Sequence, residues 1–234
     1  MATRRFAPGY ILSLATALAV GITLVVLALP RTAAGLAKLQ GTLAIDKLRE
    51  GAAISDQAIE SAMLSFNGAN GWVDSAARWS ALARLQYARA LLADRDSEER
   101  QAALRLSKEA SRRAIALNPA LPEPWLHLAQ SEFALNRISP QMIRALAMTY
   151  RTGRYNRFTV YAMSELAFAT WSKLDGDTRK AASEQLAFAV VQHTSRLVAI
   201  SERLHASAIV RRALRRQPEL LAKFDRAIEN HPRG

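Results

Sequence analysis

The sequence predicts an all-α protein, with one transmembrane helix at the N-terminus and a helical body after it. Three observations support this fold class. Residues 11–29 are apolar and uncharged, and later apolar residues recur at spacings of three and four. The remainder shows neither sustained apolar–polar alternation nor an Asn-Gly hairpin between β-branched runs.

Composition excludes several classes of protein. Half of the 234 residues are hydrophobic, and the chain has only 10 Gly and 8 Pro, which excludes a collagen-like or low-complexity chain. The absence of cysteine excludes disulfides, Cys-ligated metal sites and a Cys nucleophile. A formal net charge of +12 favours anionic partners such as phosphate headgroups, acidic polymers or nucleic acid.

The apolar run at residues 11–29 predicts a membrane anchor. As a helix it would span about 28 Å, close to the thickness of the bilayer hydrocarbon. A cleaved signal peptide would have a shorter apolar core, of about 7–15 residues. That alternative stays open because residues 32–35, Thr-Ala-Ala-Gly, resemble a cleavage site, and a buried core helix is a third.

Charges around the run bear on its orientation. Arg4 and Arg5 precede it and favour a cytoplasmic N-terminus with the body on the other side. Arg31, Lys38 and Lys47 follow it and weaken the asymmetry. We expect the body to lie outside the cytoplasm.

Two helices are predicted between the anchor and residue 73. The first covers residues 36–49 and continues from the membrane segment. The second is capped by Ser55 and Asp56 and runs to Phe66. Residues 67–71, Asn-Gly-Ala-Asn-Gly, predict a break between this helix and the next.

Two helical pairs are predicted over residues 74–156. Asp74 or Ser75 begins a long helix, and Ser97 caps the next after a turn at residues 94–96. Its expected buried stripe is Leu106, Ala110, Ala114 and Leu117. Pro119 ends that helix, and Pro124 lies in the first turn of the third. Ser139-Pro140 begins the fourth helix, which ends near Thr149. A turn is expected after it, at Thr152-Gly153.

Further helices are predicted over residues 157–234. Residues 158–173 are apolar on nearly every side, so we expect a central, buried helix. Asp175 and Asp177 bracket a turn, with Asp177 capping the next helix. A stripe of a following helix is expected at Leu197, Ile200, Leu204 and Ala208. Pro218 begins the last helix, giving eight or nine in antiparallel pairs.

Residues 114–129 resemble the junction between two tetratricopeptide repeats. Ala114 and Pro119 match the end of one repeat; the next begins with Trp125, Leu128 and Ala129. The same opening occurs earlier as Trp79, Leu82 and Ala83. The two tryptophans are 46 residues apart where the family has 34, so the first unit is enlarged. The resemblance implies a solenoid of antiparallel helix pairs.

The second half adds a more particular resemblance. Residues 150–156, Tyr-Arg-Thr-Gly-Arg-Tyr-Asn, precede an apolar helix that ends at residues 171–175, with Arg179 after it. This layout resembles small membrane-anchored, tetratricopeptide-like proteins of bacterial exopolysaccharide and O-antigen clusters. It implies an accessory or scaffolding role in polymer assembly or export. Together with the charges around the apolar run, it leads us to expect a bacterial inner-membrane protein with a periplasmic body.

The implied organisation has five parts. They are a flank at residues 1–10, an anchor at 11–30, juxtamembrane helices at 31–73, repeats at 74–156 and a helical tail at 157–234.

The sequence offers no catalytic, cofactor or metal site. His127, His193, His205 and His231 form no His-Glu-x-x-His pattern, and neither a phosphate-binding glycine loop nor a Gly-x-Ser-x-Gly elbow occurs. Asp175 and Asp177 suit a turn better than a calcium site. We therefore expect a protein that is not an enzyme and has no cofactor.

Two basic clusters are the candidate contact sites. Tyr150, Arg151, Arg154, Tyr155 and Arg157 surround a predicted loop, where arginines bind anions and aromatic rings stack on sugars. A second cluster lies near a helix C-terminus and comprises Arg211, Arg212, Arg215 and Arg216. Carbonyl capping and solvated charge at helix ends explain the first cluster more simply than a contact site does. A solvated face or headgroup contact explains the second more simply than nucleic acid does.

These features favour a membrane-tethered helical-repeat scaffold that binds a protein partner, itself membrane-associated. Anionic headgroups or polysaccharide are further candidate partners. One alternative is a structural subunit or assembly factor of an integral membrane complex, since Ala15, Ala17, Ala19 and Gly21 permit close helix packing. Another is a nucleic-acid-binding module, which charge alone supports and which we do not favour.

Overall fold

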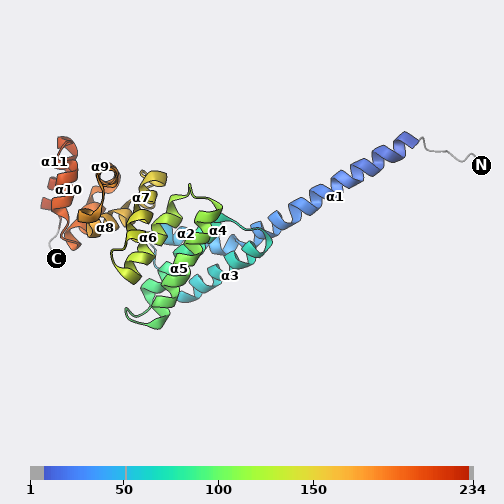
Figure 1. The fold of residues 1–234 in the computed structure, drawn as a ribbon, viewed down its shortest axis with the longest axis horizontal. Helices are drawn as coiled ribbons and strands as arrows, with labels where there is room; N and C mark the ends of the chain where they lie inside the picture. Colours follow the sequence, from blue (N-terminus) through green and yellow to red (C-terminus); the bar gives the residue numbers. More distant parts are fainter. Residues whose placement is uncertain (1–7, 51, 232–234) are drawn as a thin grey trace, which may run out of the picture.

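The computed structural model describes residues 8–50 and 52–231, and in these ranges the chain is all-α (Figure 1). Eleven α-helices and one short 3-10 helix follow one another there, with no strand. Ten of the α-helices come after the first, so the prediction of eight or nine in the body is too low. Most helices adjacent in sequence pack antiparallel, whereas the second continues in the direction of the first. They are α1 (Pro8–Ala37), α2 (Leu39–Glu50), α3 (Asp56–Trp72), α4 (Ala76–Leu92), α5 (Glu98–Leu117), α6 (Pro122–Asn136), α7 (Pro140–Gly153), α8 (Val160–Thr170), η1 (Trp171–Lys173), α9 (Gly176–Arg203), α10 (Ser207–Leu214) and α11 (Pro218–Glu229).

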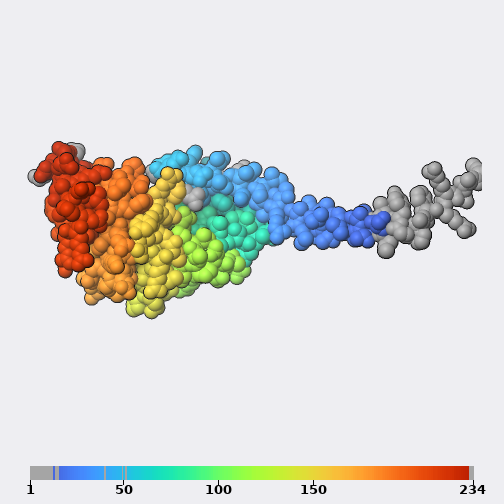
Figure 2. All heavy atoms as spheres, turned by 90° about the horizontal axis from the view of Figure 1, so that it is seen from above, coloured from blue at the N-terminus to red at the C-terminus, as the bar shows by residue number. Residues whose placement is uncertain are grey.

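Helix α1 projects from one end of the body as a single stalk (Figures 1 and 2). Within it, Thr16–Ala37 is long and apolar enough to cross a membrane, with a mean hydropathy of 1.9. Membrane anchors and signal sequences share that length and composition. Its large apolar side chains between Leu18 and Leu29 are more than half exposed, so this stretch is not a core helix of the body.

The base of the stalk packs against α3. Only Lys38 separates α1 from α2, and its N–H still bonds the Ala34 carbonyl at 3.3 Å. The Gly41 N–H donates to Ser65 Oγ at 3.2 Å, and the Phe66 ring lies directly over Gly41. Ala44, Ile45, Ile59 and Phe66 then form a buried cluster that joins α2 to α3.

The predicted break at residues 67–71 is wrong, because α3 runs through it to Trp72. The cap at Ser55 is confirmed, since its Oγ accepts the Ala58 N–H at 3.3 Å. Ala69 is fully buried, and Asn70 Oδ1 accepts a hydrogen bond from Arg78 Nε at 2.8 Å. These contacts hold the segment helical, although each glycine in it costs up to about 1 kcal/mol relative to alanine.

The predicted starts of α5 at Ser97 and of α7 at Ser139-Pro140 are confirmed. Ser97 Oγ accepts the Arg100 N–H and Ser139 Oγ accepts the Met142 N–H, both at 3.1 Å. Thr152 and Gly153 belong to the last turn of α7, so the predicted turn there begins later.

The expected stripe of α5 is half wrong. Ala110 and Ala114 are buried, but Leu106 and Leu117 are 49% and 43% exposed. The buried face instead consists of small residues with one leucine: Ala103, Leu104, Ser107, Ala110, Ser111 and Ala114. Small side chains permit neighbouring helices to approach closely, and the longer ones point elsewhere.

Helix α8 is buried on most sides, as predicted, and contacts α9. Asp175, rather than Asp177, caps α9, because its Oδ1 accepts the Thr178 N–H at 2.7 Å. A kink at His193 divides α9. Leu197 and Ile200 are buried beyond it, whereas Leu204 follows the helix end and Ala208 is exposed on α10, so the predicted stripe is only half right.

Helices α10 and α11 close the end of the body opposite the stalk (Figure 1). Pro218 begins α11, as predicted. Phe224 is fully buried against Val210 and Leu214 of α10 and Leu197 of α9. This cluster extends the core of the body to its last helix.

Candidate functional site

An open groove follows the first helices of three successive pairs, α4, α6 and α8. Its volume is about 310 Å³, and the end of α9 closes one side. The lining combines apolar and aromatic surface with a few polar groups: Tyr87, Gln130, Phe133, Ala162, Glu165, Leu166, Phe168, Ala169, Arg203 and Leu204. Such a mixture suits a segment of another protein, because apolar contact supplies affinity and polar groups fix orientation.

Charge is concentrated at one side of this groove. Glu165 forms an ion pair with Arg203, and both side chains remain partly exposed. Burial raises the pKa of Tyr87, the nearby Glu165 carboxylate raises it further, and Arg100 opposes the shift. Tyr87 therefore stays a neutral phenol at physiological pH and offers a ring face with a polar hydroxyl.

A chain of buried serines holds the helices that line the groove. Ser107 of α5 donates to the Ala83 carbonyl of α4 at 2.8 Å and accepts from Ser131 of α6 at 2.9 Å. All three residues are fully buried, and Ala129 beside them is too. Polar atoms at this depth must be paired, so the bonds fix the spacing of α4, α5 and α6.

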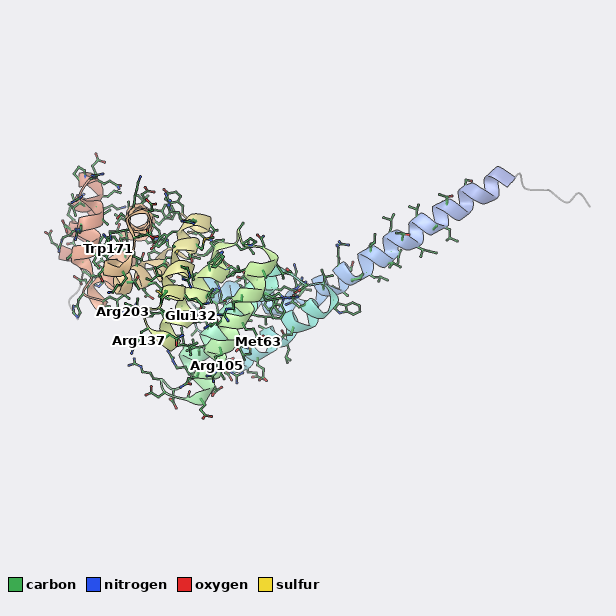
Figure 3. The ribbon with its side chains drawn as sticks, viewed as in Figure 1. Met63, Arg105, Glu132, Arg137, Trp171 and Arg203 are labelled. Atoms are coloured by element: carbon green, nitrogen blue, oxygen red, sulfur yellow. The ribbon has the colours of Figure 1, made fainter. Side chains whose placement is uncertain are left out.

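A buried ion pair lies next to the serines. Glu132 of α6 is 1% exposed and pairs with Lys108 of α5, while Asn136 donates to it at 2.9 Å. Burial works to raise the pKa of Glu132, but the hydrogen bonds from Lys108 and Asn136 outweigh it, so the pKa lies below its ordinary value. Figure 3 shows Glu132 in the middle of the body. The pair therefore fixes the α5–α6 packing and does not face a ligand.

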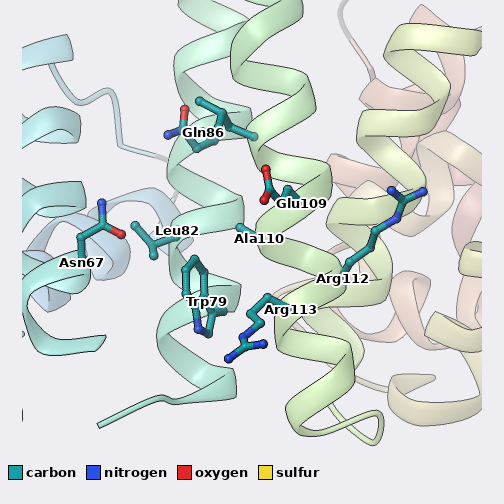
Figure 4. Close-up of a pocket in the computed structure, with 9 residues that line it drawn as sticks. Asn67, Trp79, Leu82, Gln86, Glu109, Ala110, Arg112 and Arg113 are labelled. Carbon is teal, nitrogen blue, oxygen red and sulfur yellow. The ribbon is translucent and has the colours of Figure 1, made fainter. Parts of the chain in front are cut away.

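A second hollow, of about 630 Å³, lies between α3, α4 and α5 (Figure 4). Asn67 faces it from α3, Trp79, Leu82 and Gln86 from α4, and Glu109 and Arg113 from α5. At its edge Asp74 accepts hydrogen bonds from Trp79 Nε1 and from Arg113, the latter at 2.6 Å. The bond from Trp79, and then that from Arg113, lower the pKa of Asp74.

No protein-family model, curated protein or solved structure matches this chain.

The predicted cluster at the end of α7 is only partly a surface. Tyr150 is 2% exposed, and its hydroxyl donates to the Met163 carbonyl at 3.5 Å, so it belongs to the core and not to a contact site. Arg154 pairs with Glu184 of α9. Tyr155 is 57% exposed and packs edge-on against Phe188, with 5.6 Å between ring centroids.

Two arginines of this cluster remain exposed. Arg151 lies in the last turn of α7, and Arg157 lies over the Phe158 ring with its guanidinium carbon 4.7 Å from the centroid. Arg151, Tyr155 and Arg157 are thus exposed, whereas Tyr150 and Arg154 contribute to packing.

The second basic cluster lies at the end of the body farthest from α1 (Figure 1). Arg211 donates to Asp225 of α11 at 2.8 Å. Arg212, Arg215 and Arg216 are exposed. Because α1 leaves the opposite end, this cluster is badly placed to reach a bilayer that holds α1.

Among the described residues, no group of three or more His, Asp or Glu side chains could hold a metal ion. His127 is 5% exposed, and burial, aided by the nearby Arg84, lowers its pKa to about 3, so it is neutral. Its Nδ1 contacts Gln130 Oε1 at 3.1 Å. His127 is therefore a residue of the α6 core.

The groove was not among the predicted sites, although the sequence carries a signal for it. Tyr87 follows Trp79, and Phe133 follows Trp125, by eight residues. Eight residues along a helix turn the side chain by about 80°, which places these rings on one neighbouring face of α4 and α6. Aromatic residues repeated at that offset predict a shared lining.

Proposed function

We propose that this protein is a non-enzymatic, membrane-tethered helical-repeat scaffold that binds a protein partner. Helix α1 is its single anchor, in a bacterial inner membrane, and the body lies on the periplasmic side. The observation that carries the proposal is the open groove along α4, α6 and α8. An accessory role in cell-envelope polysaccharide biosynthesis or export follows from the resemblance at residues 150–179.

Packing at the base of α1 supports an anchor that is retained. Ala34, in the middle of the cleavage-like residues 32–35, is 2% exposed in the helical base of the stalk. Ser65 of α3 donates to the Ala37 carbonyl three residues later. Cleavage after residue 34 would remove part of this packed helix.

Equivalent contacts in the first two pairs support a tetratricopeptide-like arrangement. Ala83 of α4 and Ala129 of α6 occupy the same repeat position and are both fully buried. Trp79 and Trp125 are each half-buried, and each indole donates to a polar atom before its own helix: Asp74 Oδ1 for Trp79 and the Pro119 carbonyl for Trp125. Stacked pairs of this kind expose the first helices as a binding surface.

The expected ligand is a helical or extended segment with an apolar side chain beside a charged one. The apolar side chain would meet Phe133 and Leu166, and the charged one would meet Glu165 or Arg203. Tethering raises the effective concentration of the scaffold for a partner in the same membrane. A modest groove can thereby support a specific complex.

The test is affinity purification of the full chain from membranes, followed by binding of the identified partner to groove variants. Ala169→Arg puts a long cation into the groove, and we expect it to weaken binding about tenfold or more. Ala116→Arg places the same substitution at an exposed site on α5, which does not line the groove, and should bind like wild type. Equal binding by both variants would contradict the proposal.

A further inference from the structure

The exposed tryptophan at the end of α3 lies beside the point where the apolar stalk leaves the body. Trp72 is the last residue of α3 and is 59% exposed. An indole this open is unusual for a body whose other large side chains are mostly packed, and it lies outside both hollows described above. Its position relative to α1 suggests a role for it.

Contacts between α1, α2 and α3 fix that position. Ser65 donates to the Ala37 carbonyl and accepts from the Gly41 N–H, so it lies level with the α1–α2 junction. The earlier Ile59 shares a cluster with Ala44 and Ile45, which lie later in α2. The helices are therefore antiparallel, and α3 ends toward the apolar part of α1.

The level of Trp72 follows from helix geometry. It comes seven residues after Ser65, which advances it about 10 Å along α1 toward the N-terminus. That places Trp72 level with about residue 32 of α1. Arg31, the first charged residue after the apolar run, is exposed at this same level.

We propose that Trp72 is an interfacial membrane contact, whose indole lies among the lipid headgroups next to the stalk. Indole rings gather at the membrane–water boundary because they combine a large apolar surface with one N–H donor. The bilayer that holds α1 occupies this surface, because Trp72 lies level with the end of the apolar run of α1. The contact gives the body a second attachment and limits the depth and tilt of α1.

This inference rests on the proposed anchoring by α1, and the experiment separates the two. The full chain is reconstituted in vesicles of phosphatidylcholine and phosphatidylglycerol, with bromine on the acyl chains near the headgroup end or near the chain terminus. Flotation of the vesicles tests the anchor. Tryptophan emission of wild type minus that of Trp72→Phe isolates the signal of Trp72 from Trp79, Trp125 and Trp171.

We expect the Trp72 signal to fall about twofold or more with shallow bromine, and less with deep bromine. Leu64 supplies the matched control, because it is 68% exposed on the same helix and lies eight residues, about 12 Å, farther from the apolar run. In the Trp72→Phe/Leu64→Trp chain, shallow bromine should have little effect.

Each other outcome contradicts a defined part of the account. Suppose that the chain floats with the vesicles while Trp72 is quenched by aqueous iodide and not by brominated lipid, or by neither because protein covers it. Either result leaves the proposed anchor intact and contradicts the interfacial contact. Equal quenching at positions 64 and 72 would also overturn it. A chain that does not float with the vesicles overturns both proposals.

Discussion

Ser131 of α6 donates a fully buried hydrogen bond of 2.9 Å to Ser107 of α5. Ser107 in turn donates to the Ala83 carbonyl of α4. Two side chains of minimal size thus join three helices, two of which line the groove. Their bonds allow the helices to approach as closely as an alanine face would while leaving no hydroxyl unpaired.

The first prediction concerns this serine pair. Ser107→Ala leaves the Ser131 hydroxyl without its acceptor and should lower the free energy of unfolding by about 1–2 kcal/mol. Adding Ser131→Ala removes the orphaned hydroxyl, so the double variant should be nearly as stable as Ser107→Ala alone. Thermal unfolding of the full chain in detergent micelles measures both. Strictly additive losses would show that the bond does not couple the helices.

The second prediction compares the effect of alanine on stability at two glycines, Gly41 and Gly68. A Cβ on Gly41 would lie 2.6 Å from the ring of Phe66, which is buried, so Gly41→Ala should destabilise by about 1–3 kcal/mol. A Cβ added to Gly68 would have no neighbouring atom within 4 Å, so Gly68→Ala should stabilise helix α3 by about 0.5–1 kcal/mol. Opposite shifts in Tm would confirm the packing of α3 on the base of α1. A stabilised Gly41→Ala chain would refute it.

The buried ion pair gives a third prediction. Lys108→Met leaves the Glu132 carboxylate, which is 1% exposed, without its ion-pair partner and should cost about 3–5 kcal/mol. Lys108→Met/Glu132→Met removes both charges and should recover much of that loss. Denaturant unfolding of the two variants measures the difference. The proposed structural role would be wrong if the single variant lost less than the double.

The fourth prediction is a dependence of stability on pH. The pKa of His127 is about 3 in the folded chain against 6.5 when unfolded, so between these values the unfolded chain binds a proton that the folded chain does not. Stability should therefore fall as the pH drops from 6.5, by at most about 1.4 kcal/mol per pH unit from this residue.

Substitution separates His127 from Glu132. The pKa of Glu132 lies below its ordinary 4.5 in the folded chain, so its contribution is lost only as the pH falls from 4.5 through that lower value. In His127→Gln the decline between pH 6.5 and 4.5 should shrink and the later decline should remain. Unfolding curves at several pH values measure this. An unchanged decline above pH 4.5 would contradict a buried, neutral His127.

Local signals predicted much of the fold. The caps at Ser55, Ser97 and Ser139 were predictable because each hydroxyl bonds an N–H three residues later, within the same short segment. The burial of α8 followed from its nearly uniform apolar character.

Features set by distant contacts were not predictable in this way. The glycines at residues 68 and 71 indicated a break, but Ala69 packs into the core and α3 continues. Leu106 was expected inside α5, yet the small face of Ser107 and Ser111 meets the neighbouring helices. At the kink of α9 the freed His193 carbonyl accepts from the Tyr161 hydroxyl at 3.5 Å, a contact across 32 residues.

In the candidate site, too, features set by contacts between distant residues could not be predicted from local sequence. Sequence proximity grouped Tyr150 with the neighbouring arginines, but a side chain's direction depends on its place in the helix, and Tyr150 points into the core. The groove unites Tyr87, Phe133 and Glu165 from three helices, and only the stacking of the pairs brings them together.

The most direct test of the central claim is site-specific photo-crosslinking of the full chain in intact cells. A photoreactive residue at Ala169 lies in the groove, and one at Ala116 lies on exposed α5 surface outside it. We expect light to join the chain at Ala169, and not at Ala116, to the same membrane-associated protein that copurifies with it. Adducts of equal yield at both positions, or none at Ala169, would contradict a scaffold that binds its partner through α4, α6 and α8.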